Sequence, residues 1–229
     1  EFLRSVLTLV SRNDYEAVFP VGDSTITVLQ KFREEWPKVP LVMADRKSYE
    51  KVSDKFFCQR LAASEGLSLP ETYYPQSVEE MEKGVERIGF PVVLKPRYSR
   101  FYDEKTGTLQ VGDTQLVFEG KTLREAFLRL RQGDSFPCVQ KWVPGKGLGV
   151  EILLKQGRVL AAFCHERLRE MNPLGSGSSA ALSVPVSQEW VQAGVSLLKG
   201  CGYEGAAMVE FRVDKQAGKT WFMEVNGRF

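Results

Sequence analysis

The sequence contains little of the chemistry that zinc proteins and histidine-dependent enzymes use. Its 229 residues include one histidine, His165, and four cysteines, none of which forms a Cys-x-x-Cys pair. A single histidine excludes a His-rich zinc site. Four separated cysteines with largely apolar neighbours favour packed, reduced thiols, as in a cytoplasmic protein, over a zinc cluster.

Long apolar runs and an excess of one charge are also absent. No apolar stretch approaches the roughly 20 residues that span a bilayer, and no signal peptide is evident. With 31 basic and 29 acidic side chains the net charge is +2, which provides no argument for a nucleic-acid or membrane partner. The length and a hydrophobic content of 43% suffice for one large domain or two small ones.

The first 46 residues predict part of an α/β unit. An apolar run at 16–21, a helical pattern at 26–36 and a short strand at 39–44 follow in the order strand, helix, strand, which suggests a parallel sheet. Such a sheet normally needs more strands. We therefore expect a remnant of a preceding domain here, and additional domains in the full-length protein.

The remaining chain predicts a mixture of helices and strands, the α+β class. A capping box at 77–80 begins one of the helices. Residues 97–107 and 170–180 are expected to be loops. We expect helices at 53–65, 77–88, 122–131 and 189–200, single strands at 71–74, 90–96 and 138–143, and hairpins at 108–111/115–118, 150–155/158–166 and 206–213/220–225.

The last hairpin is expected to bring two carboxylates together. If the turn pairs Asp214 with Thr220, Glu210 lies opposite Glu224. Because strand side chains alternate between faces, the same face carries Arg212 beside Glu210, and Asn226 and Arg228 beside Glu224. Opposed carboxylates repel one another, and Mg²⁺ prefers carboxylate and amide oxygens. The alternative is a solvent-facing hairpin in which Glu210 pairs with Arg212 or Arg228.

Five motifs in order resemble those of the ATP-grasp superfamily. Glu224 to Arg228 is similar to its closing Glu-x-Asn-Pro-Arg motif, with Gly227 in place of proline, and Val209 to Phe211 resembles the strand of the other metal-binding glutamate. Upstream, Asp54-Lys55 with Gly66 and Pro70 resembles the opening "DK…G…P" pattern. The segment 90–96 resembles the "(F/Y)PVVLKP" strand, and 139–145 resembles the hinge strand that binds adenine.

This resemblance implies the ATP-grasp fold, in which two α+β subdomains grip ATP, preceded here by the remnant of the pre-ATP-grasp α/β domain at 1–46. The subdomains are expected at 47–133, with the lid, and at 134–229. The implied cofactors are ATP and Mg²⁺, or Mn²⁺ in its place. The implied metal ligands are Glu210, Glu224 and Asn226, and the implied nucleotide-binding residues are Lys55, Lys95, Gln140, Lys141, Trp142 and Val143. Candidate apolar walls for adenine are Val93, Phe211 and Phe222.

Two features depart from the superfamily pattern. The segment 97–107, where a glycine-rich loop is usual, contains one glycine. Charged side chains of Arg97, Arg100 and Lys105 can compensate, and a surface loop with scattered charges is the alternative. Gln140 stands where many members have glutamate, but its amide oxygen still accepts a hydrogen bond.

The substrate side is expected near Arg167 and Arg169, which alternate with Leu168 and should face one way. Two arginines beside the Gly/Ser-rich segment 173–179 suit a carboxylate or phosphate. A solvated loop with surface arginines is the alternative. The pattern resembles a carbamoyl-phosphate-synthase-like group of carboxylate–amine ligases, and it implies that Arg167 and Arg228 hold the acid and the transferring phosphoryl group.

The expected activity is therefore ligation, in which a carboxylate becomes an acyl phosphate that an amine or similar nucleophile attacks. Two alternatives remain open: a kinase that stops after phosphoryl transfer, and a non-catalytic ATP-binding module. We expect a cytoplasmic protein whose partners are a small-molecule carboxylate and amine. Nucleic acid and membrane are not expected as partners, whereas additional domains or a homo-oligomer are.

Overall fold

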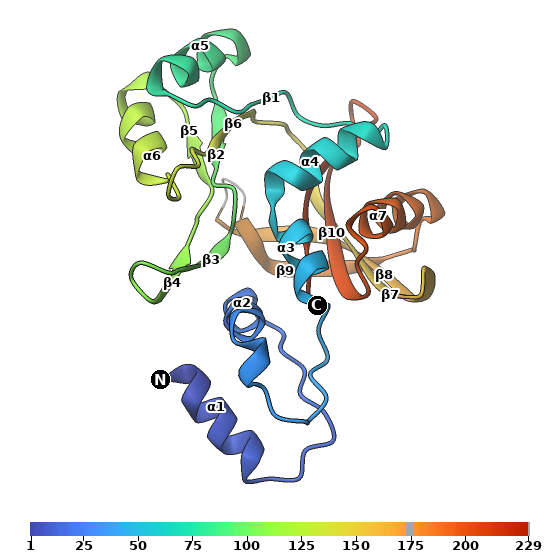
Figure 1. Cartoon of the computed structure of the whole chain (residues 1–229). Helices are drawn as coiled ribbons and strands as arrows, with labels where there is room; N and C mark the ends of the chain where they lie inside the picture. The colour runs from blue at the N-terminus through green and yellow to red at the C-terminus, as the bar shows by residue number, and fades with distance from the viewer. Residues whose placement is uncertain (173–175, 229) are drawn as a thin grey trace.

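The computed structural model describes residues 1–172 and 176–228 (Figure 1). Two β-sheets, each with helices against one face, make up most of the molecule, and a smaller N-terminal unit lies beside them. The expected α+β class is confirmed. In the described part of the chain no helix is long and apolar enough to cross a membrane.

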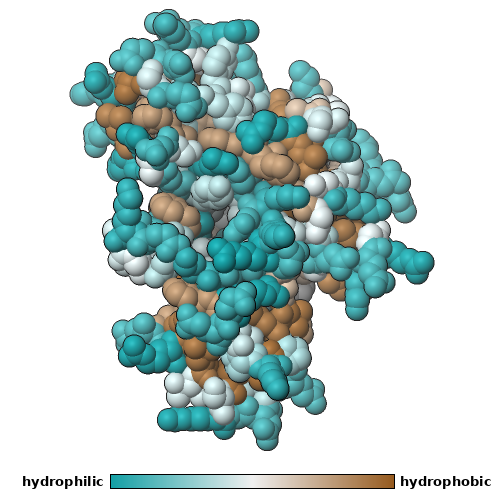
Figure 2. Space-filling model, in the orientation of Figure 1, coloured by the Kyte–Doolittle hydropathy of each residue, from teal (hydrophilic) through white to brown (hydrophobic). Residues whose placement is uncertain are grey.

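The N-terminal unit contains helix α1 (Phe2–Ser11), helix α2 (Asp23–Lys31) and a short 3-10 helix, η1 (Arg33–Glu35). The expected strands at 16–21 and 39–44 are wrong as strands, because only Val18 and Leu41 form a bridge. That bridge is parallel, as predicted. Prolines at 20 and 40 lack the N–H needed to extend it. Apolar side chains gather on the surface of this unit (Figure 2), so it buries less apolar surface than the two sheets do.

The expected helix at 53–65 is preceded by a separate helix that the sequence pattern did not reveal. Helix α3 (Arg46–Ser53) and helix α4 (Lys55–Ser64) meet at Asp54, whose extended backbone separates them. Asp45 caps α3 and Asp54 caps α4 by accepting hydrogen bonds from backbone amides. The pattern failed to reveal α3 because its interior is mostly charged and polar.

The four-stranded sheet has the order β1-β6-β2-β5 and is antiparallel throughout. Helices α5 (Val78–Ile88) and α6 (Leu123–Arg129) lie on it, and Met81, Leu94 and Phe127 are in its fully buried core. Ser77 caps α5 as the capping box predicted. The strands are β1 (Thr72–Tyr73), β2 (Val92–Lys95), β5 (Gln115–Val117) and β6 (Cys138–Lys141).

The expected loop at 97–107 and the expected hairpin around residues 112–113 are wrong. Strand β3 (Arg100–Asp103) pairs with β4 (Thr108–Val111), and β5 pairs with β2 instead of β4. The turn of the real hairpin lies at 104–107, where Gly107 has φ of 65°. Asp103 accepts a hydrogen bond from the Lys105 amide there. The β3–β4 hairpin extends from the four-stranded sheet towards α2 (Figure 1).

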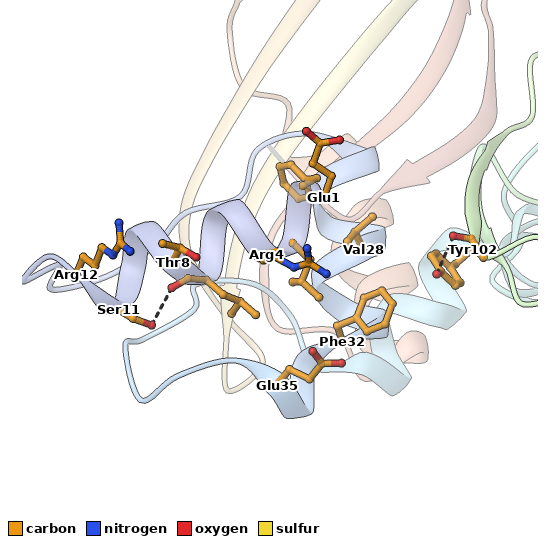
Figure 3. Close-up of a pocket in the computed structure, with 13 residues that line it drawn as sticks. Glu1, Arg4, Thr8, Ser11, Arg12, Val28, Phe32, Glu35 and Tyr102 are labelled. Atoms are coloured by element: carbon orange, nitrogen blue, oxygen red, sulfur yellow. Dashed lines mark hydrogen bonds between the residues drawn. The ribbon is translucent and has the colours of Figure 1, made fainter.

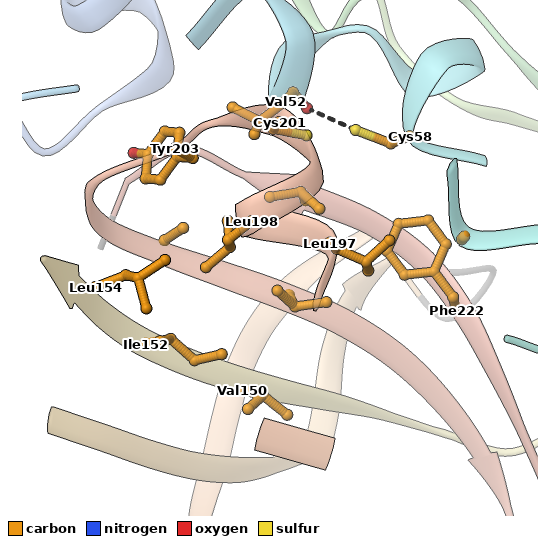
Figure 4. Packing of buried hydrophobic residues seen from close by; sticks show 14 of the residues in the cluster. Val52, Cys58, Val150, Ile152, Leu154, Leu197, Leu198, Cys201, Tyr203 and Phe222 are labelled. Atoms are coloured by element: carbon orange, nitrogen blue, oxygen red, sulfur yellow. Dashed lines mark hydrogen bonds between the residues drawn. The ribbon is translucent and has the colours of Figure 1, made fainter. Parts of the chain in front are cut away.

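The five-stranded sheet has the order β11-β10-β7-β8-β9. Helix α7 (Gln188–Cys201) packs on one face of it, together with α3 and α4. Figure 4 shows Ile152 and Leu154 of β7 under Leu197 and Leu198 of α7, all at most 2% exposed. The strands are β7 (Lys146–Lys155), β8 (Arg158–Asn172), β9 (Ser176–Val184), β10 (Gly205–Asp214) and β11 (Lys219–Asn226).

The expected loop at 170–180 is wrong where strand β9 lies, from residue 176 onward. Residues 176–184 pair with β8 across two irregularities in register. The segment is Ser- and Ala-rich and has no clear alternation, which explains why the sequence predicted a loop. Residues 173–175 of the expected loop lie outside the described residues.

Candidate functional site

A cavity of about 280 Å³ lies between the two sheets and is lined by nearly all the residues that the sequence singled out. Another cavity, of about 730 Å³, lies between α1, α2 and the β3–β4 hairpin (Figure 3), and it contains none of the predicted site residues. We therefore place the site at the first cavity. The predicted residues that line it are Lys95, Gln140, Lys141, Trp142, Val143, Arg167, Glu210, Glu224, Asn226 and Arg228, while Lys55 lines a small adjoining cavity of about 30 Å³.

Glu210 and Glu224 face one another across β10 and β11, as predicted. The register at the turn differs from the prediction, because Asp214 pairs with Lys219 rather than with Thr220. A β-bulge between Glu210 and Phe211 offsets this shift of one residue.

Three cations offset the repulsion between the two carboxylates. Arg167 donates to both oxygens of Glu210, at 2.9 and 2.5 Å. Lys55 forms an ion pair with Glu224 at 3.5 Å and donates a hydrogen bond to the Ser99 hydroxyl. The third cation, Lys95, is 6% exposed. The alternative of a solvent-facing hairpin is excluded, since the Glu210 side chain is only 14% exposed and pairs with neither Arg212 nor Arg228.

The two carboxyl groups are perturbed in opposite directions. Burial and the nearby Glu224 raise the pKa of Glu210, and Arg167 opposes this rise. Burial also raises the pKa of Glu224, but Lys55, Lys95 and Arg167 outweigh it, so this pKa lies below its usual value. Burial lowers the pKa of Lys95, although Glu224 favours its charged form. Groups with shifted pKa values that share one cavity are typical of functional sites.

Arg167 reaches Glu210 by crossing an intervening strand. It lies on β8, Glu210 lies on β10, and β7 runs between them. The crossing needs glycine on β7, because a Cβ at Gly147 would lie 2.7 Å from Arg167 Cδ. Among the described residues the buried Arg167 Nε has no hydrogen-bond partner. This donor therefore suits an anionic ligand in the cavity.

Arg169 does not accompany Arg167. Irregular register on both sides of Arg169 interrupts the strict alternation, and Arg169 is exposed and does not line the cavity. The expectation that both arginines face one way is therefore wrong. Arg228 lines the cavity, and its Nε donates to Asp23 of α2 at 2.7 Å. Sequence reasoning missed Asp23, since no local signal linked it to residue 228.

Residues 140–143 of the predicted hinge strand, which include the end of β6, line the cavity, and Trp142 is 38% exposed there. The Gln140 side chain is buried and donates to the Thr72 hydroxyl at 2.9 Å. The backbone amide of Lys141 donates to Glu71 and that of Trp142 donates to Pro91. These two amides are thus engaged within the protein, and an adenine base would use other backbone groups of the segment.

Two of the expected apolar walls are wrong. Phe211 and Phe222 lie in the core on the other face of the five-stranded sheet. Met208 and Met223 line the cavity with Val93 instead. Alternation along β10 could have identified Met208, because it lies two residues before Glu210. Met223 neighbours the bulge, which no local pattern indicates.

The donor set of the carboxylate pair suits a hard cation. A carboxylate offers about four lone-pair sites, so the two hydrogen bonds from Arg167 leave Glu210 able to accept a further ligand. Glu224 and the Asn226 amide oxygen belong to the oxygen class that Mg²⁺ binds. No cluster of three or more His, Cys, Asp or Glu occurs in residues 1–172 and 176–228. The four cysteines are free and buried, as predicted.

We compared the chain with known proteins. No family model matches the sequence. The chain is 25% identical over 191 residues to the α subunit of mitochondrial methylcrotonoyl-CoA carboxylase of Arabidopsis thaliana. The aligned region covers 77% of this chain and 25% of the relative. The chain is 21% identical over 203 residues to the N-terminal section of the carbamoyl phosphate synthase large chain of Aquifex aeolicus, covering 83% and 34%. The chain thus spans at most about a third of either relative.

Solved structures are similar over more of the chain. A biotin carboxylase–βγ-ATP complex from Campylobacter jejuni matches with a TM-score of 0.77 and 19% identity, over 99% of this chain and 52% of that one. The D-alanine–D-alanine ligase of Bacillus anthracis complexed with ATP matches with a TM-score of 0.61 and 18% identity, over 90% and 62%.

These solved structures identify the fold of the chain. The chain has the ATP-grasp fold, and the resemblance to ATP-grasp proteins that the five ordered motifs carry is confirmed. The domain boundaries, the remnant of a preceding domain at 1–46 and the role of each site residue remain predictions.

Proposed function

We propose that this chain is the nucleotide-binding core of an ATP- and Mg²⁺-dependent ligase that joins a small carboxylate to an amine or similar nucleophile. The carboxylate pair carries the proposal. Glu210 and Glu224 oppose one another inside a cavity of an ATP-grasp fold, with Lys55, Lys95 and Arg167 around them. Similar solved structures include an ATP complex of a ligase and a βγ-ATP complex of a carboxylase.

The charges of the cavity suit a nucleotide with its metal. ATP carries about four negative charges, and fixed cations together with Mg²⁺ offset them. Glu210, Glu224 and Asn226 are proposed to hold Mg²⁺, whose positive charge would stabilise the phosphates. Lys55 and Lys95 are proposed to bind the phosphates. The adenine would lie along residues 140–143, beside Trp142.

The proposed reaction has two steps. A carboxylate oxygen of the acid would attack the γ-phosphorus, so that an O–P bond forms and ADP leaves. The nitrogen of the amine would then attack the acyl carbon, and inorganic phosphate would leave. Arg167 and Arg228, which line the cavity, are proposed to hold the acid and the phosphoryl group in line. The four reduced, buried thiols support the proposed cytoplasmic location.

Binding can be tested separately from chemistry. Mg-ATP should raise the melting temperature of the wild-type chain through mass action, and Glu224→Gln and Glu210→Gln should remove most of the Mg²⁺-dependent part of this rise. Glu86→Gln, at an exposed position on α5, is the matched control and should respond like wild type. Unchanged Mg²⁺-dependent stabilisation in both cavity variants would show that the metal assignment is wrong.

Chemistry is tested by measuring ADP and inorganic phosphate across a panel of carboxylates and amines, with the full-length protein. A ligase releases phosphate at an appreciable rate only when acid and amine are both present. A phosphorylated product that accumulates without an amine would identify a kinase instead.

A further inference from the structure

The β3–β4 hairpin occupies the place where the superfamily usually has a glycine-rich loop, and one of its cations faces the cavity. Arg97 donates two hydrogen bonds to Asp54, at 3.0 and 2.6 Å. Lys105 lies at the exposed turn. Arg100 lines the cavity of the carboxylate pair and also two neighbouring cavities, of about 30 and 310 Å³. Of the three cations considered for phosphate binding, the structure therefore selects Arg100.

The guanidinium of Arg100 is held at the cavity that contains the carboxylate pair. Its Nη1 donates to the Ser99 carbonyl at 2.6 Å, and its Nε donates to the Ser24 hydroxyl at 3.3 Å. The Ser99 hydroxyl accepts from Lys55, which pairs with Glu224. A guanidinium has five N–H donors, and these two contacts use only part of them.

The backbone leading into Arg100 is fixed. The Gln132 side chain donates to the Tyr98 carbonyl at 2.8 Å and accepts from the Tyr98 amide at 3.0 Å. The Gly112 amide donates to the Ser99 carbonyl at 2.9 Å. A Cβ at Gly112 would lie 2.4 Å from the Tyr98 carbonyl oxygen, so this close approach needs glycine. The backbone here therefore has little conformational entropy left to lose when a ligand binds.

The rest of the hairpin is attached to α2 and the residue after it. Lys31 forms an ion pair with Glu104 and lies 5.8 Å from the centre of the Tyr102 ring. Phe32 meets Tyr102 edge to face, with ring centroids 5.4 Å apart. Figure 3 shows Phe32 and Tyr102 on facing elements. The N-terminal unit thus holds the hairpin beside the cavity.

We propose that Arg100 binds the terminal phosphates of the nucleotide, in place of the backbone N–H groups of a glycine-rich loop, and that α2 fixes the hairpin in the position this requires. The inference rests on the proposed function. The guanidinium geometry suits phosphate because it can donate two parallel hydrogen bonds. A hairpin with one glycine cannot readily form the concave run of amides that binds phosphate elsewhere, so a side chain takes over that task.

The test compares nucleotides that differ in their phosphates. Isothermal titration of the 229-residue chain with Mg-ATP, Mg-ADP and AMP is carried out for wild type, Arg100→Gln and Arg100→Lys. Arg100→Gln should weaken Mg-ATP about 10- to 100-fold, the range of a charge-assisted hydrogen bond, and leave AMP within about twofold. Arg100→Lys should lie between the two, because it keeps the charge but loses the bidentate geometry. Lys105→Gln, which removes a cation from the same hairpin, is the matched control and should bind like wild type.

Two results would overturn the proposal: Mg-ATP binding by both Arg100 variants within about twofold of wild type, or an equal loss of AMP affinity, which would indicate general damage to the cavity. Melting temperatures show whether each variant is folded. If Arg100→Gln does not fold, Arg100→Lys still allows the comparison with wild type. If wild type fails to bind Mg-ATP at all, the proposed function fails instead, so the two failures are distinguishable.

Discussion

Asp54 connects helix α4 to Arg97, and its loss should cause a measurable change in stability. Its Oδ1 accepts from the amides of Phe56 and Phe57 at 3.0 and 3.1 Å, which caps α4. Its Oδ2 accepts from Arg97, the residue whose carbonyl accepts from the Lys55 amide. The Asp54 side chain is 10% exposed. Asp54→Ala therefore removes the cap and leaves Arg97 without its partner.

The expected cost combines these two losses. Loss of an N-cap costs about 1 kcal/mol. The ion pair adds about 0.2–1 kcal/mol, because solvent screens Arg97, whose side chain is 37% exposed. We expect Asp54→Ala to lower the free energy of unfolding by about 1–2 kcal/mol. At about 2–4 °C per kcal/mol for a chain of this size, the melting temperature should fall by about 2–8 °C.

Urea denaturation at pH 7 measures the effect, with Asp54→Asn as the matched variant. Asparagine is also a good N-cap, so it should cost less than about 1 kcal/mol. Arg97→Met and the double variant complete a cycle that isolates the pair, for which we expect a coupling of about 0.2–1 kcal/mol. The reasoning is refuted if Asp54→Ala is as stable as wild type, or if asparagine destabilises the protein as much as alanine does.

Two further predictions concern the five-stranded sheet. Gly149→Ala should lower the free energy of unfolding by about 1–3 kcal/mol, because its Cβ would lie 2.2 Å from the His165 ring. Gly120→Ala has open space around it and should change this free energy by less than about 0.5 kcal/mol. Equal urea midpoints for the two variants would contradict the prediction. Hydrogen bonds from Lys146 and a second lysine hold the pKa of Glu166 below its usual 4.5, so its stabilisation is present above that value and is lost as pH falls through the depressed pKa. Glu166→Gln should therefore be less stable than wild type at pH 7, by up to about 1 kcal/mol, and the gap should close in acid; a gap that persists at pH 2 would contradict the assignment.

Local sequence patterns predicted those parts of the fold and the site that depend on residues close together along the chain. The capping box at 77–80 begins α5 as expected, because its two partners are three residues apart. Alternation along β10 and β11 placed Glu210 opposite Glu224, even though the turn register differs by one residue and a bulge offsets the difference. The ordered motifs predicted the ATP-grasp fold, since each motif lies within a few residues of one element.

Contacts between distant parts of the chain could not be predicted in this way. Arg167, which pairs with Glu210, is 43 residues away from it on a strand beyond β7. Asp23, which accepts a hydrogen bond from Arg228, is 205 residues away from it. Likewise, the pairing of β3 with β4, and the burial of Phe211 and Phe222 beneath the sheet, depend on which elements lie alongside.

The sequence by itself determined the order of the motifs, the alternation that opposes Glu210 and Glu224, and the near-neutral charge, because these are properties of residues close together along the chain. Only the tertiary structure decided which cations stand beside those carboxylates. It placed Arg167, held across Gly147, beside Glu210, and Lys55 beside Glu224. The physical reason is that an ion pair depends on distance in space, and that distance is set by the packing of strands and helices whose separation in sequence carries no local signal.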